Sequence, residues 1–131
     1  MSIEKKKAEL LTHKEQMRLI NNELSVIDQE IITLKTIKNS LEEIEKLEEG
    51  TEILSQIGGG LYIKTKLKKN DEILINVGSN IIVVKSVQEA REFIEKQIRE
   101  LNDLLVRLEM ELQRQAIKVK DLQEEIEKLK K

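Results

Sequence analysis

Apolar residues recur along the last third of the chain with alternating steps of four and three residues. Aliphatic side chains fill ten of eleven consecutive positions of this pattern, and Gln115 is the one polar residue among them. A repeat of 3.5 residues sustained over five heptads is typical of a coiled coil and leaves little room for any other fold of this segment. The aliphatic positions are Ile94, Ile98, Leu101, Leu105, Leu108, Leu112, Val119, Leu122, Ile126 and Leu129.

The first third of the chain carries the same pattern, with an interruption at its start. Lys6 and His13 occupy positions where the repeat expects an apolar side chain. Gly50 follows a charged helical stretch and predicts the end of this first helix. We therefore expect helices over residues 1–49 and 87–131. The apolar positions of the first helix include Ile3, Leu10, Met17, Leu24 and Ile31, seven residues apart.

Two helices of similar length joined by a short middle segment are expected to fold back on each other, because neither can leave its apolar seam in water. An antiparallel pair that aligns Leu47 with Gln88 places Gln115 near Asn21 and Asn22. Ser86 and Glu89 have the spacing of a capping box and mark the start of the second helix.

Between the helices, residues 50–86 contain short runs with a period of two. The segments "EILSQI", "LYIKTKL", "EILINV" and "IIVVK" are rich in β-branched residues and are separated by turn residues, which predicts two β-hairpins in series. All five glycines of the chain lie in or beside this region. We expect four of them to form turns or bulges where positive φ is required, namely Gly58, Gly59, Gly60 and Gly78.

Two isolated hairpins cannot bury two faces of a sheet. Since the helices should lead away from the strands, we expect the sheets of other subunits to cover them, by pairing between chains or by closure into a barrel. The residues assigned to this oligomerisation surface are Leu61, Ile63, Leu67, Ile73, Ile75, Val77, Ile81 and Val83.

Catalytic and cofactor sites find little support in the sequence. The glycine run is followed by a strand, and its spacing fits neither a P-loop nor a dinucleotide fingerprint. His13 is the only histidine and there is no cysteine, so no metal set based on these residues can form, and the glutamates indicate a solvated helix face. Basic and acidic residues are interspersed, which gives no field for nucleic acid or membrane. We expect no enzyme, cofactor or metal, and a cytoplasmic location.

The two helix ends remote from the strands carry aliphatic side chains that could bind a partner. They either pair as ordinary seam or, because Lys6 and His13 weaken the seam there, become exposed by fraying and capture apolar segments. The residues are Ile3, Leu10, Leu11, Val119, Leu122, Ile126 and Leu129.

The order helix, two hairpins, helix resembles the prefoldin family, and specifically its alpha-type subunits. The most specific part is "GGGLYIKTKLKKNDEILINVGSNIIVVKSVQEAREFIEKQIREL". The resemblance implies one α+β domain over residues 1–131, in which a long antiparallel coiled coil is joined by two β-hairpins that assemble into an oligomeric β-barrel.

The resemblance also implies a function. Two alpha-type and four beta-type subunits would form a hexamer that acts as an ATP-independent chaperone, capturing unfolded proteins at the coiled-coil tips and passing them to a group II chaperonin. Some alpha-like members instead form homopolymeric filaments through their hairpins. A purely structural coiled-coil filament is therefore the alternative.

Overall fold

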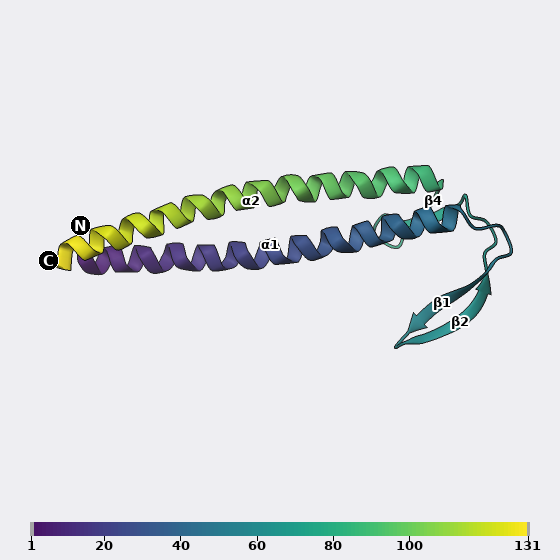
Figure 1. Cartoon of the computed structure of the whole chain (residues 1–131), viewed down its shortest axis with the longest axis horizontal. Coiled ribbons are helices and arrows are strands. Elements are labelled where there is room, and N and C mark those ends of the chain that lie inside the picture. The colour runs from purple at the N-terminus through teal and green to yellow at the C-terminus, as the bar shows by residue number, and fades with distance from the viewer. Residues whose placement is uncertain (1, 131) are drawn as a thin grey trace. The chain divides into compact units, whose positions relative to one another are not determined.

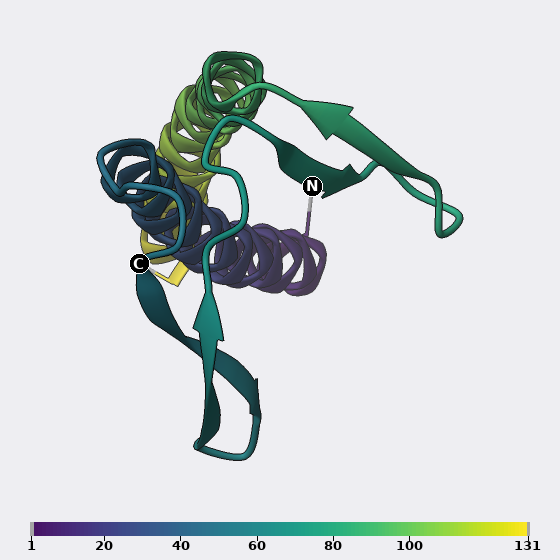
Figure 2. The same ribbon diagram turned by 90° about the vertical axis from the view of Figure 1, so that its right-hand side faces the viewer.

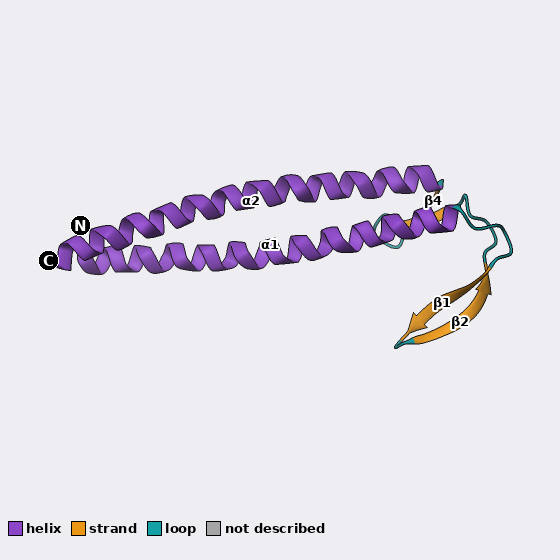
Figure 3. Cartoon of the chain, in the orientation of Figure 1, coloured by secondary structure: helices purple, strands orange, loops and turns teal. Residues whose placement is uncertain are grey.

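The computed structural model describes residues 2–130 of the chain. Its elements follow the order helix, four strands, helix: α1 (Ile3–Glu45), β1 (Glu52–Gly58), β2 (Leu61–Lys66), β3 (Ile73–Asn76), β4 (Ile82–Lys85) and α2 (Val87–Lys130) (Figure 1). Every element predicted from the sequence is present, and the strands occupy only the short segment between the two helices (Figure 3).

The start of α2 has the predicted capping box. The Ser86 hydroxyl accepts a hydrogen bond from the Glu89 amide at 3.0 Å, and the Glu89 carboxylate accepts one from the Ser86 amide at 3.1 Å. These bonds satisfy amide groups that have no partner within a helix. α1, in contrast, ends at Glu45 and not at Gly50, because the chain turns at residues 46–50 with hydrogen bonds from Lys46 and Leu47 to carbonyls three residues earlier.

The chain divides into two compact units. The first consists of residues 1–32 and 99–131, that is, the N-terminal part of α1 and the C-terminal part of α2. Lys6 contacts Glu125 and His13 contacts Gln115, so the two helices run antiparallel in this unit. Its buried side chains come from both helices and are Ile20, Ile27, Ile31, Gln115, Leu122 and Ile126.

The second unit, residues 33–98, contains the four strands and the adjoining parts of both helices. Lys38 pairs with Glu95 and Glu45 with Arg91, which agrees with the predicted register at this end. The core is a cluster of Leu41, Val87, Ala90 and Ile94. Leu34, Ile73, Ile75 and Ile98 pack against this cluster.

The packing of Ile73 and Ile75 corrects one expectation. We expected the helices to lead away from the strands and leave both faces of each hairpin to other subunits, but one face of the second hairpin is covered by the helices of its own chain. The reason is the short connection between β4 and α2. Only Ser86 separates them, so the first turn of α2 lies beside the hairpin and offers Val87 and Ala90 to it.

The strands form two separate two-stranded antiparallel sheets, β1 with β2 and β3 with β4 (Figure 2). The first hairpin has a register shift between Gln56 and Gly58, the bulge that the glycine run predicted. Gly59 and Gly60 form its turn with φ of 55° and 77°, a region that other residues avoid. Gly58, Gly59 and Gly60 thus have the positive φ that the sequence analysis expected at a turn.

Candidate binding surfaces

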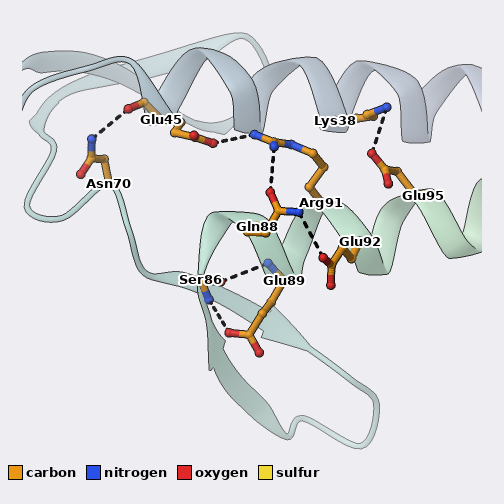
Figure 4. A network of polar contacts seen from close by, with 9 residues as sticks. All are labelled: Lys38, Glu45, Asn70, Ser86, Gln88, Glu89, Arg91, Glu92 and Glu95. Carbon is orange, nitrogen blue, oxygen red and sulfur yellow. Dashed lines mark hydrogen bonds and ion pairs between the residues drawn. The ribbon is translucent and has the colours of Figure 1, made fainter.

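A polar network joins the end of α1, the linker between the hairpins and the start of α2 (Figure 4). Asn70 in the linker donates hydrogen bonds to the carbonyls of Glu45, at 3.2 Å, and Leu47, at 2.6 Å. Arg91 donates to the Glu45 carboxylate at 2.6 Å and to the Gln88 amide oxygen at 3.0 Å. The last carbonyl of α1 and one in the turn that follows thereby gain a side-chain partner, which ties the linker to the helix end.

The first hairpin exposes apolar side chains on both of its faces. Cross-strand partners share a face, so Leu54 and Tyr62 lie on one side while Ile63 lies on the other beside Ser55. Ser55 and Thr65 hydroxyls meet at 2.7 Å on this second side. Two of the residues assigned to oligomerisation, Leu61 and Ile63, are exposed here, whereas Leu67 is half-buried. Such a surface is available for contact with another chain.

The second hairpin has two unlike faces. Ile73, Ile75 and Val83, which the sequence assigned to oligomerisation, lie on the face toward the helices. The opposite face carries Leu74, with 70% of its surface exposed, together with Ile82 and Val84. The sequence interpretation did not assign these three residues, although strict alternation in "ILIN" and "IVVK" separates them from the inner set.

A shallow groove of about 320 Å³ lies between the second hairpin and α2. It is lined by apolar side chains together with two lysines and two glutamates. The lining residues are Ile75, Val77, Val83, Lys85, Glu89, Glu92, Phe93 and Lys96. Val77 and Ile81, the remaining residues of the predicted oligomerisation set, are exposed near the β3–β4 turn.

The first unit contains all seven residues predicted to bind a partner at the helix ends. Leu122 and Ile126 are buried in the seam, with 8% and 6% exposure. Leu11 and Leu129 are exposed, with 68% and 51%. Ile3, Leu10 and Val119 are half-buried. Most of these residues therefore lie at least partly buried between the two helices, and two aliphatic side chains are exposed to solvent.

Lys6 and His13, which interrupt the apolar seam, both have partners on α2. The Lys6 ammonium donates to the Glu125 carboxylate at 2.5 Å. His13 Nδ1 lies 2.5 Å from Gln115 Oε1, so the expectation that Gln115 lies near Asn21 and Asn22 is wrong. The prediction extended the register of the hairpin end over some 25 residues, across the step of three residues between Leu34 and Ile37 that breaks the heptad spacing of α1.

Ionisable groups with shifted pKa values lie at the surface. Hydrogen bonds from Ser86 lower the pKa of Glu89, and a hydrogen bond from Arg18 lowers that of Glu15. The same pairing raises the pKa of Arg18, and Glu72 raises that of Lys69. Within residues 2–130, no three His, Cys, Asp or Glu side chains come close enough to hold a metal ion. No helix in this range is long and apolar enough to span a membrane.

An antiparallel helical pair with two hairpins between the helices, one of them exposed on both faces, defines a coiled-coil protein that carries β-hairpins. The prefoldin subunit family model matches residues 13–131, and the chain belongs to the prefoldin family. The match covers most of both helices and all four strands, so the resemblance seen in the sequence is confirmed. The chain is a chaperone subunit of the alpha type.

Individual relatives agree with this assignment. The chain is 31% identical to prefoldin subunit alpha of Thermofilum pendens over 85% of its own length and 81% of that protein. It is 30% identical to prefoldin subunit alpha of Methanobrevibacter smithii, covering 92% and 82%. Among solved structures, filamentous prefoldin from Methanocaldococcus jannaschii matches with a TM-score of 0.81 and 27% identity, over 90% of this chain and 98% of that one.

Proposed function

We propose that this chain is a subunit of an ATP-independent holdase, which binds unfolded proteins and prevents their aggregation without catalysis. The observation that carries the proposal is the family match over residues 13–131. It is supported by the apolar surfaces that the described residues of the hairpins and helices offer.

Client capture would begin on Leu11 and Leu129, the exposed aliphatic residues among those predicted at the helix ends. Opening the seam beyond His13 and Gln115 would then expose Leu122 and Ile126. A polar layer in a coiled coil lowers the stability of the segment between the layer and the helix ends. Separating the helices from their ends up to this layer therefore requires less free energy than separating them past it.

Assembly would occur through the hairpins, with beta-type prefoldin subunits, two alpha-type with four beta-type, as partners. The doubly exposed first hairpin and the outer face of the second, with Leu74, Ile82 and Val84, support this step. We further propose that the assembled protein works in the cytoplasm and delivers its clients to a group II chaperonin.

Light scattering of a chemically denatured client, diluted into buffer without nucleotide, tests the holdase proposal. The chain assembled with a beta-type partner should suppress aggregation in proportion to its concentration. Unchanged aggregation at a severalfold excess of the assembly would reject the proposal.

A second measurement locates the capture surface. Leu11→Ser combined with Leu129→Ser should weaken protection while the oligomer keeps its size. Val106→Ser is the matched control, because Val106 is exposed to a similar degree, 54%, on the side of α2. Equal protection by both variants would place capture elsewhere.

The structure of filamentous prefoldin supports a second candidate, a self-assembled filament, because the present chain covers 98% of that chain at a TM-score of 0.81. Sedimentation of the purified chain separates the two forms. Open-ended polymers without a partner favour the filament, and a defined complex that forms only with a beta-type subunit favours the hexamer.

A further inference from the structure

The first unit exposes two pairs of apolar residues outside its seam. Leu19 and Val26 lie seven residues apart on α1 and are 46% and 57% exposed. Met110 and Ile117 lie seven residues apart on α2 and are 62% and 60% exposed. Each pair spans two helical turns on one side of its helix, about 10 Å. The coiled coil and the predicted client-binding ends use neither pair.

The charged side chains around the two pairs have opposite signs. Neighbours on a helix surface are the residues three and four positions away. For Leu19 and Val26 these include Glu15, Glu23 and Glu30, together with uncharged amides. The Glu15 carboxylate is paired with Arg18 on the same helix, so the negative charge on this side comes mainly from Glu23 and Glu30. We call this group the acidic face, with members Leu19, Val26, Glu15, Glu23 and Glu30.

The neighbours of Met110 and Ile117 are mainly basic. They include Arg107, Arg114 and Lys120 on the basic side and Asp121 on the acidic side, and Arg114 lies 3.4 Å from the Glu111 carboxylate. We call this group the basic face, with members Met110, Ile117, Arg107, Arg114 and Lys120. All five are exposed in the structure.

We propose that the acidic face of one copy of this chain packs against the basic face of a second copy, so that coiled coils associate side by side. The equal spacing lets Leu19 and Val26 cover Met110 and Ile117 while the surrounding charges pair. Because both faces are exposed in the same chain, they do not cover each other. Complementary charge around an apolar centre favours this partner over one of unrelated charge.

The contact joins two different surfaces and is therefore heterologous, so each copy retains one unused face and the contact can repeat. The proposal does not depend on hairpin assembly or on client capture. Loss of holdase activity would leave it intact.

Disulfide crosslinking tests the contact directly, because the chain contains no cysteine. Val26→Cys and Ile117→Cys chains are mixed and oxidised under mild conditions. We expect a crosslinked dimer in the mixture, well above the yield of either variant alone. Leu11→Cys mixed with Ile117→Cys is the control, since Leu11 is exposed but lies outside both faces. A yield no higher than this control would overturn the proposal.

Charge reversal tests the complementarity. Glu23→Lys with Glu30→Lys makes both faces basic, and Arg107→Glu with Arg114→Glu makes both acidic. When both crosslinking partners carry the same reversal, the yield of crosslinked dimer should fall to that of the control. Crosslinking should recover when the Val26→Cys chain carries the two glutamate reversals and the Ile117→Cys chain carries the two arginine reversals, because the contacting faces then have opposite charge again. The crosslinking yield of the original pair should fall in 0.5 M salt.

An alternative occupant is an unfolded client. If the reversals weaken client protection but leave the crosslink between copies unchanged, the faces bind clients and the proposed contact is wrong. Recovery of the crosslink in the mixed pair cannot arise from client binding when the experiment contains only the chain.

Discussion

His13, one of the polar residues in the apolar seam of α1, and Gln115, the polar residue in that of α2, meet each other across the coiled coil. Gln115 Nε2 donates to the Glu111 carboxylate at 3.0 Å, which fixes the orientation of the amide and leaves Oε1 for His13. Since Oε1 only accepts, His13 Nδ1 must carry the proton that it donates. Gln115 is 8% exposed, so this bond satisfies a buried polar group.

Gln115→Ala should destabilise the coiled coil by about 1–3 kcal/mol, because it leaves His13 without a partner in a partly buried position. The double variant His13→Leu with Gln115→Leu should be as stable as the original chain or more so, since both partners become apolar together. Urea denaturation followed by circular dichroism measures both. A double variant less stable than Gln115→Ala would contradict this account.

The capping box predicts a dependence on pH. Hydrogen bonds from Ser86 hold the pKa of Glu89 below its ordinary value of 4.5. The contribution of this carboxylate to stability is therefore present above the ordinary value and is lost as the pH falls through the lowered one. Hydrogen exchange at the start of α2 should speed up on acidification below about pH 4.5 relative to Glu89→Gln, which cannot titrate. Identical pH profiles of the two proteins would count against the prediction.

Asn70 should hold the end of α1 in place. Asn70→Ala removes two hydrogen bonds to carbonyls and should cost roughly 0.5–1.5 kcal/mol for each, with faster hydrogen exchange at residues 46–50. Asn70→Asp keeps the shape but cannot donate, so it should behave like the alanine variant. Lys68→Ala, in the same linker, is the control. Normal protection in Asn70→Asp would show that the donated bonds are unimportant.

The sequence predicted the helices, both hairpins and the capping box because each depends on residues close together in the chain. The sequence did not predict the contacts between segments that lie far apart in the chain. The contact of Gln115 with His13 depends on register summed over many turns, and the packing of Ile73 and Ile75 depends on how α2 leaves the second hairpin. The role of Asn70 had no local signal at all, since its partners lie more than 20 residues away.

Gly59→Val should disturb the first hairpin. Gly59 has φ of 55° with no atom within 4 Å of an added Cβ, so the cost is backbone strain alone and not a clash. This strain amounts to about 1–2 kcal/mol for an ordinary residue and more for a β-branched one. Gly59→Asn should be tolerated, because asparagine adopts this region. Size-exclusion chromatography should show impaired assembly for valine only, and equal assembly of both would make our account of the turn wrong.

The two faces of the second hairpin should respond differently to the same truncation. Ile75 packs against the helical cluster, so Ile75→Ala should destabilise the unassembled chain by about 1–3 kcal/mol, less than the 2–5 kcal/mol typical of a fully buried site. Leu74→Ala, one residue away on the outer face, should leave the stability of the unassembled chain within about 0.5 kcal/mol of the original. In a mixture with beta-type subunits, however, Leu74→Ala should weaken assembly, because its exposed side chain contributes apolar area only when another chain covers it. Denaturation of the chain alone and sedimentation of the mixture separate the two effects. A Leu74→Ala chain that assembles normally would show that the outer face of this hairpin is not an assembly surface.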